Sequence, residues 1–326
     1  MKNEIPIFFS IDDNYIPCLG VAIHSLEKNA NKNNNYKLII LNSGITEKSR
    51  AQIKKMEQDN VKIEFKDISN LGEDIKEDMS LRLRDYYSLT IYYRLFIAKL
   101  YPEYHKAVYI DSDIVLLDDI ANLYNIDLGG KMIGAIPDGV VHDTPPFKEY
   151  VKINLGVEPD KYFNSGVLLM DLDKFRENKI EEKFIEILTK YNCDTIAPDQ
   201  DYLNFLCKGK IKYLPISWDK MPEYDKHLDV KDIHLIHYNM FKKPWHYKDV
   251  EYSNVFWNIA KETEFFDTLK KELESYTDEQ RENDQKGTGM MGVITEKIMK
   301  SNNKFVDIKE EIQKGRKWKK AQKDYK

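Results

Sequence analysis

The chain has 326 residues, a net charge of −5 and 42% hydrophobic residues, a length that suits one large α/β domain or two small ones. The negative charge argues against a nucleic-acid partner. The three cysteines, Cys18, Cys193 and Cys207, are widely spaced, which is typical of free thiols in a reducing compartment. No apolar run reaches transmembrane length and residues 1–6 lack a signal-peptide pattern, so we expect a soluble cytoplasmic protein.

Apolar runs and amphipathic segments alternate through the first third of the chain, which predicts an α/β fold. A polar loop at residues 12–15 (Asp-Asp-Asn-Tyr) separates the first strand from a helix with Pro17 in its first turn. No G-x-G-x-x-G turn or P-loop follows this strand, so a bound pyrophosphate needs another partner, such as a metal, to neutralise it. The predicted strands are residues 5–11, 37–41 and 61–65, and the predicted helices are residues 16–26, 45–59 and 87–100, with a polar loop over 70–85.

Two aspartates interrupt the apolar run of residues 106–116. The flanking Val, Ile and Leu residues predict a buried strand of a parallel sheet, with Asp111 and Asp113 where it ends. Buried carboxylates are costly unless they are paired or hold a metal, and a spacing of two places both on one side of an extended backbone. The triplet therefore predicts a divalent-cation site at the carboxyl edge of the sheet. A solvated Asp-Ser-Asp turn is the alternative.

The second half of the chain continues the alternation. Residues 140–162 contain three prolines, which predicts a loop-rich insertion of the kind that shapes a substrate cleft. The acidic residues of 197–204 fall at a predicted helix N-terminus, where caps are an alternative explanation. A glycine-containing break over 285–292 precedes a basic tail. The predicted strands are residues 132–138, 162–170, 211–214 and 233–238, and the predicted helices are residues 180–191 and those from 255 onward.

Four motifs in a fixed order resemble glycosyltransferase family 8, which includes glycogenin and bacterial lipopolysaccharide galactosyl- and glucosyltransferases. The motifs are residues 12–15 (Asp-Asp-Asn-Tyr), 109–113 (Tyr-Ile-Asp-Ser-Asp), 163–167 (Phe-Asn-Ser-Gly-Val) with 199–201 (Asp-Gln-Asp), and 237–238 (His-Tyr) with 243–245 (Lys-Pro-Trp). Several independent motifs in order are more specific than any one of them. The resemblance covers about residues 5–260.

The resemblance implies an α/β GT-A fold, in which a Rossmann-like, mostly parallel central sheet is flanked by helices. This domain would occupy residues 1–260, followed by a helical C-terminal extension with a basic tail over residues 261–326. The implied reaction is a retaining transfer of glucose or galactose from a UDP-sugar to a saccharide, glycolipid or glycoprotein acceptor. Mn²⁺ is the implied metal, with Mg²⁺ as the alternative.

The resemblance also implies a role for each matching residue. Asp111, Asp113 and His237 would hold the metal, and one imidazole among hard oxygen ligands suits Mn²⁺ better than Mg²⁺. Without the motif, His237 would be a satisfied strand-end histidine. The residues that match donor-binding positions are Asp12, Asn14, Tyr15, Arg94, Asp111, Ser112, Asp138, Asn164, Ser165 and Lys243.

Within the donor-binding set, Asp12 and Asn14 match the loop that binds uracil and ribose, and Tyr15 matches the ring that stacks on the base. Arg94 matches a basic residue near the donor sugar, with a buried structural arginine as the alternative. Lys243 matches the lysine that meets the diphosphate, where negative charge builds on the departing UDP.

Gln200 and Asp199 are the implied catalytic residues, with Gln200 on the far face of the sugar and Asp199 as a sugar binder. Because an amide is a weak nucleophile, the residues favour a front-face reaction, in which the leaving phosphate oxygen takes the acceptor's proton, over a covalent one. Asp199 and Asp201 stay open as nucleophiles or hydrogen-bond partners. Met240 stands where the family usually has glycine, and its side chain is expected to shift this loop or its amide.

Two other functions stay open. A nucleotidyltransferase also pairs aspartates with a metal, although it would carry a glycine-rich basic loop where this chain has the acidic residues 12–14. A catalytically silent sugar-nucleotide-binding protein is the second, although the chain retains the metal and reaction-centre positions. Residues 314–326 contain seven basic residues and one acidic residue, so a peripheral contact with the inner face of a membrane and a solvated tail are both open.

Overall fold

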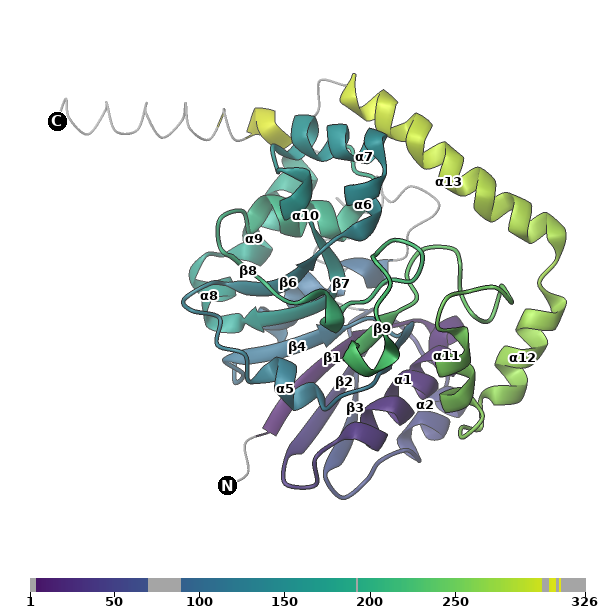
Figure 1. Cartoon of the computed structure of the whole chain (residues 1–326). Helices are drawn as coiled ribbons and strands as arrows, with labels where there is room; N and C mark the ends of the chain where they lie inside the picture. The colour runs from purple at the N-terminus through teal and green to yellow at the C-terminus, as the bar shows by residue number, and fades with distance from the viewer. Residues whose placement is uncertain (1–3, 70–88, 192, 301–304, 309–310, 312–326) are drawn as a thin grey trace.

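The computed structural model describes residues 4–69, 89–191, 193–300, 305–308 and 311, which form a central seven-stranded sheet with helices on both faces and a separate two-stranded sheet (Figure 1). In spatial order the strands of the large sheet are β3 (Val61–Asp67), β2 (Asn35–Asn42), β1 (Glu4–Ser10), β4 (Lys106–Ile110), β7 (Phe163–Asp171), β6 (Ile133–Pro137) and β8 (Ile211–Tyr213). The predicted mostly parallel α/β sheet is therefore confirmed.

Strand β7 is the exception, because it runs antiparallel to both of its neighbours. Its pairing register sets Val167 opposite Ile110, the last residue of β4. The polar start of β7 therefore lies at the same edge of the sheet as the polar end of β4. One hydrogen bond marks this junction, donated by the amide of Asp111 to the carbonyl of Gly166 over 2.8 Å.

The apolar run of residues 106–116 forms two strands rather than the single strand expected from the sequence. Strand β4 ends at Ile110, and after a bend over residues 111–113 the chain enters β5 (Ile114–Leu116) in the small sheet. There β5 pairs antiparallel with β9 (Leu235–His237), with Ile114 opposite His237. The bend between the two sheets therefore brings the aspartates beside a histidine more than a hundred residues later in the chain.

Helices cover both faces of the large sheet (Figure 1). On β1, Ile7 and Phe9 belong to one buried apolar cluster and Phe8 to the other, because successive side chains of a strand point to opposite faces. The α-helices are α1 (Ile16–Asn29), α2 (Glu47–Lys54), α4 (Ile97–Leu100), α5 (Ile120–Tyr124), α6 (Gly139–Asp143), α7 (Pro145–Tyr150), α8 (Leu172–Glu177), α9 (Ile180–Glu186), α10 (Pro198–Leu206), α11 (Ser253–Ala260), α12 (Phe266–Ser275) and α13 (Asp278–Met299). None of these described helices combines the length and the apolar character that a membrane span requires.

Two segments are more helical than the sequence indicated. The predicted loop-rich stretch 140–162 instead contains α6, α7, the π-helical turn η4 (Val151–Leu155) and the 3₁₀ turn η5 (Pro159–Lys161). Two of its three prolines stand at the first position of α7 and of η5, where a missing amide costs nothing, so they begin helices rather than interrupt them. The predicted helix over 87–100 is described from residue 89, first as the 3₁₀ segment η3 (Leu89–Phe96) and then as α4. The loop expected over 70–85 lies outside the described residues.

The break expected over 285–292 is wrong, because α13 runs through it without interruption. The glycines of this run have the spacing G-x-G-x-x-G but stand inside a helix, which is not the strand-to-helix context of a dinucleotide-binding turn. A capping box fixes the start of α13: the Thr277 side chain accepts from the amide of Gln280, and the Gln280 side chain accepts from the amide of Thr277.

A buried carboxylate joins three of these elements. Asp201 of α10 is fully buried and accepts hydrogen bonds of 2.6 Å from the hydroxyls of Tyr150, at the end of α7, and Tyr162, just before β7. The amide of Ile196 donates to it over 3.0 Å. Burial raises the pKa of Asp201 to about 6. The carboxylate therefore fixes the start of α10 against the polar start of β7.

The raised pKa gives a prediction on stability. The folded state binds this proton more tightly than the unfolded chain, where an aspartate titrates near ~3.9, so the stability that Asp201 contributes is full below pH ~4 and decreases as the pH rises through about 6. We expect the free energy of unfolding of the wild type, minus that of Asp201→Asn, to fall by ~1–3 kcal/mol between pH 4 and pH 7. Urea denaturation at both pH values measures this difference, and a constant difference would contradict the assignment.

Candidate active site

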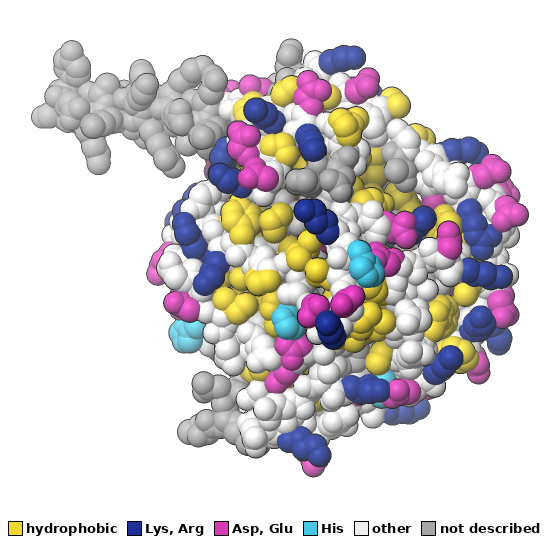
Figure 2. Space-filling view, viewed as in Figure 1, with side chains coloured by type: hydrophobic (Ala, Val, Ile, Leu, Met, Phe, Trp, Pro, Cys, Tyr) yellow, Lys and Arg dark blue, Asp and Glu magenta, His cyan; other side chains and the backbone are white. Residues whose placement is uncertain are grey.

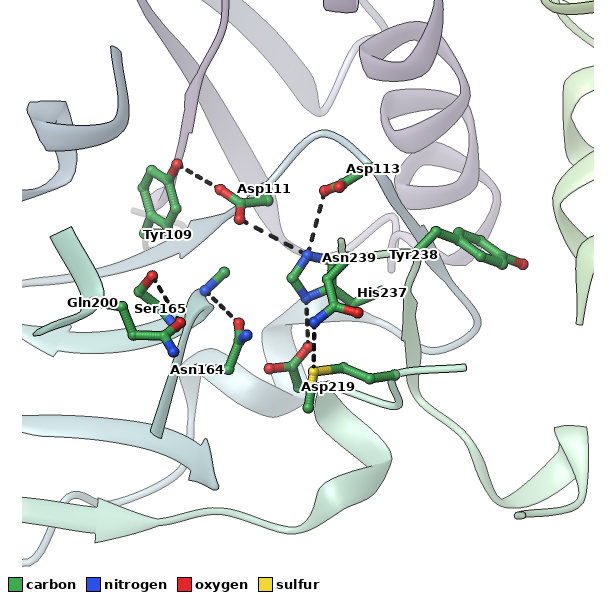
Figure 3. Close-up of polar contacts among 12 residues, drawn as sticks. Tyr109, Asp111, Asp113, Asn164, Ser165, Gln200, Asp219, His237, Tyr238 and Asn239 are labelled. Carbon is green, nitrogen blue, oxygen red and sulfur yellow. Dashed lines mark hydrogen bonds and ion pairs between the residues drawn. The ribbon is translucent and has the colours of Figure 1, made fainter. Parts of the chain in front are cut away.

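Three side chains from two sheets converge at the bend after β4. His237, the last residue of β9, places its Nε2 atom 3.3 Å from Asp113 Oδ1 and 3.8 Å from Asp111 Oδ2. One ligand atom from each of the three residues lies within 4.8 Å of the others (Figure 3). The sequence-predicted set of metal ligands is thus brought together in space.

Asp219 lies behind this histidine and was missed by the sequence reasoning. Its Oδ1 lies 2.8 Å from His237 Nδ1, and the residue is fully buried (Figure 3). Burial alone would lower the pKa of His237, but the carboxylates of Asp113 and Asp219 outweigh it and raise that pKa to about 10. With Nδ1 held by Asp219, the other ring nitrogen faces the two aspartates, which is the carboxylate–histidine arrangement of many metal sites.

Gly166 has no side chain, which leaves room for the cluster of Asp111, Asp113 and His237. A Cβ atom at this position would lie 2.3 Å from His237 Cε1 and 2.7 Å from Asp111 Oδ2, far closer than real contacts allow. Two carboxylates, one oriented imidazole and a backbone without a side chain therefore form a compact site with oxygen and nitrogen donors. This set fits a divalent cation such as Mn²⁺.

Two buried cations flank the aspartates. Arg94 of η3 donates to Asp111 Oδ1 over 3.0 Å and to the carbonyl of Ser165 over 2.6 Å, and its Nε lies 3.2 Å from Asp199 Oδ2. The Lys243 ammonium group donates to Asp113. Burial alone would raise the pKa of Asp113, but Lys243 and His237 outweigh it and lower that pKa well below its usual range. The aspartate is therefore held in its ionised form at neutral pH.

A second network lies at the start of β7 and the start of α10. The side-chain oxygen of Gln200 accepts from the Ser165 amide over 2.9 Å, and its amide nitrogen donates to Asp138 Oδ2 over 2.9 Å. Asn164 donates to the same Asp138 oxygen over 3.0 Å, and the Ser165 hydroxyl donates to Asp199 over 2.9 Å. Five predicted site residues thus form one connected group. Because both ends of the Gln200 amide are engaged, the side chain is held in one orientation.

One surface pocket collects much of the predicted donor-binding set. The predicted residues that line it are Asp12, Tyr15, Arg94, Asp111, Ser112 and Asp113. Asp12 caps the 3₁₀ turn η1 (Asp13–Tyr15), accepting from the amide of Asn14 over 2.9 Å. The Asn14 side chain is exposed and is not among the residues that line this pocket. Asp201 does not line this pocket either. Its carboxylate is fully buried and accepts hydrogen bonds from Tyr150 and Tyr162.

Met240 adopts a left-handed backbone with φ of +60°. This is the conformation that glycine favours, and a residue with a Cβ atom adopts it at a cost of about 1–2 kcal/mol. The loop thus keeps a glycine-like backbone although the residue is methionine.

Several known proteins with similar sequences are named as glycosyltransferases. The family model described as "Glycosyl transferase family 8" matches residues 6–249. A putative glycosyltransferase of Haemophilus influenzae is 32% identical over 256 residues, which cover 74% of this chain and 73% of that protein. The lipopolysaccharide 1,2-glucosyltransferase of Escherichia coli is 29% identical over 269 residues, 76% of either chain.

A solved structure is similar as well. The structure of an active-site mutant of LgtC has a TM-score of 0.65 and 26% sequence identity, and the match covers 80% of this chain and 96% of that one. A related structure of LgtC, with donor and acceptor sugar analogues, names it a galactosyltransferase. These matches bear out the GT-A fold and favour sugar transfer over nucleotidyl transfer or a silent binding function. The chain belongs to glycosyltransferase family 8.

Proposed function

We propose that the chain is a retaining hexosyltransferase that takes glucose or galactose from a UDP-sugar, with Mn²⁺ as its metal and a saccharide, glycolipid or glycoprotein as acceptor. The observation that carries the proposal is the convergence of Asp111, Asp113 and His237 at the edge of a pocket that Asp12 and Tyr15 also line. The relatives named for glucosyl and galactosyl transfer support the choice of hexose.

The donor would lie along this pocket. Tyr15 is 39% exposed, so its ring is available to stack on a base, and the neighbouring Asp12 carboxylate would accept from the uridine. Asp111 and Asp113, with His237, would hold the metal, which when bound neutralises the charge of the diphosphate. Lys243 adds a fixed positive charge beside Asp113, which would stabilise the negative charge that develops on the departing UDP.

The group of five residues at β7 and α10 would bind the donor sugar. Asp138 and Ser165 orient the amide of Gln200, and Asn164 donates to the same oxygen of Asp138. Arg94 holds Asp199. An amide held in this way is a poor nucleophile, which supports a front-face reaction. In that reaction the bond from the anomeric carbon to phosphate breaks, the leaving phosphate oxygen takes the proton of the acceptor hydroxyl, and the acceptor oxygen bonds to the same face.

The direct test is hydrolysis and transfer with UDP-glucose and UDP-galactose in the presence of Mn²⁺. We expect one of these donors to raise the melting temperature and to release UDP only when Mn²⁺ is present. A chain that neither binds nor turns over either donor with Mn²⁺ would refute the proposal. A thermal-shift screen of UDP-sugars identifies the donor.

Asp113→Asn should abolish this activity, because the change removes a proposed metal ligand and the partner of Lys243. We expect a loss of about 10²-fold or more in UDP release, with an unchanged circular-dichroism spectrum. Asp118→Asn is the matched control, because this aspartate lies outside the cluster and pairs with His234 over 3.1 Å. An Asp113→Asn protein that remains active would remove the metal role from this residue.

Asp219→Asn should weaken metal binding without touching a ligand. An asparagine can turn its amide nitrogen toward His237 Nδ1, which moves the ring proton to the nitrogen that faces the aspartates. We expect a 10- to 100-fold weaker affinity for Mn²⁺, roughly the effect of losing such a partner elsewhere, measured by electron paramagnetic resonance of free Mn²⁺. Asp229→Asn, at an exposed position paired only loosely with Lys231, is the control and should bind Mn²⁺ normally.

Residues 314–326 lie outside the described part of the chain, and we propose a cytoplasmic protein whose basic tail contacts the inner face of the membrane. Deleting these residues should abolish binding to vesicles that contain anionic lipid and leave binding to neutral vesicles unchanged. Equal binding of the full chain and the truncated chain in a sedimentation assay would refute the contact. The division into a domain over 1–260 and an extension over 261–326 also stays a prediction.

A further inference from the structure

The loop of residues 239–247 follows β9 and carries Lys243. The lysine is buried, and its ammonium group donates to Asp113 and to the carbonyl of Tyr238. The loop has no regular secondary structure, and Met240 holds it in a left-handed turn that costs free energy. Contacts from outside the loop are therefore needed to keep it in one conformation.

The C-terminal helices supply these contacts at the far end of the loop. The His246 ring stacks on that of Tyr276, the residue directly after α12, with centroids 3.9 Å apart and planes 7° apart, and its Nε2 atom lies 2.9 Å from Oε1 of Glu272 in α12. Asp284 of α13 accepts from the hydroxyl of Tyr247 over 2.9 Å and from that of Tyr276 over 2.8 Å, and Arg281 donates to the carbonyl of His246 over 3.3 Å.

The same helix holds the near end of the loop. Phe241 packs against Gly287 of α13 so closely that a Cβ atom on the glycine would lie 3.2 Å from the ring. The two contact points, Gly287 and Asp284, stand three residues apart and therefore share one face of α13. Figure 2 shows Lys, Arg, Asp and Glu side chains interspersed along the edge of the molecule where α12 and α13 run in Figure 1, as is typical of a solvated outer face.

We infer that α12 and α13 hold the loop of residues 239–247 in one conformation and thereby set the affinity for the diphosphate of the donor. Lys243 stands between the two points that the helices hold, Phe241 and residues 246–247. Asp284, Tyr276 and Gly287 are positioning residues, because they act through the loop and not on the donor. The inference rests on the proposed function, in which Lys243 meets the diphosphate.

The test compares one substitution at two glycines of α13. Gly287→Leu places a side chain against Phe241. A Cβ atom at Gly289 has nothing within 4 Å, so Gly289→Leu makes the same change to the helix at an open position. Calorimetry at saturating Mn²⁺ measures the binding of UDP and of uridine to both variants. We expect Gly287→Leu to bind UDP about 2- to 30-fold more weakly and uridine normally, because uridine lacks the diphosphate. Gly289→Leu should bind both as the wild type does.

A second pair of variants tests the inference independently, in case Gly287→Leu does not fold. Tyr247→Phe deletes only the hydroxyl that donates to Asp284, and should weaken UDP binding in the same direction. Glu282→Ala is its control on the same helix, because this side chain is 68% exposed and lies 3.7 Å from Lys286. Equal UDP affinity in Tyr247→Phe and the wild type would overturn the inference that α12 and α13 hold this loop. A loss of uridine binding equal to that of UDP would overturn it as well. Absence of UDP binding by the wild type would instead overturn the proposed function.

Discussion

The constraint on which the rest of the site depends is the placement of three carboxylates, Asp111, Asp113 and Asp219, within reach of one imidazole. Two of them, Asp113 and Asp219, are buried, and buried carboxylates destabilise a fold unless positive charge or hydrogen-bond donors compensate them. Lys243 provides positive charge at Asp113, and His237 pairs with both Asp113 and Asp219. Arg94 pairs with the third carboxylate, Asp111. The side chains that compensate the carboxylates in the fold are thus also charged groups of the proposed site.

The topology of the two sheets makes this convergence possible. Because β7 runs antiparallel to β4, its polar first residues lie beside Asp111 rather than at the opposite edge. Because the chain leaves the large sheet after β4 and enters the small one, His237 of β9 comes to the same point. A purely parallel sheet would have placed the start of β7 at the far edge of the molecule.

The sequence predicted most of the strands and a cation site at Asp111 and Asp113, since apolar runs and closely spaced carboxylates are local signals. His237 came only from the resemblance to family 8, because by itself it is an ordinary strand-end histidine. Asp219 could not be found in this way, because its role depends on a contact with His237 in the folded chain, and no sequence motif links the two residues. The prolines and glycines were misleading for a related reason. Proline and glycine disfavour helices on average. Pro145 nevertheless begins α7, and Gly287 lies within α13 in close contact with Phe241, so neither residue interrupts a helix here.

Met240 has a consequence for how relatives of this chain are recognised. A pattern that demands glycine at this position rejects the sequence, yet the backbone keeps the left-handed φ of +60° that such a pattern represents. In this chain the left-handed turn is therefore a property of the main chain that a methionine adopts at a cost of about 1–2 kcal/mol. A comparison that scores backbone conformation would therefore match this turn, whereas a pattern of residue letters would discard it.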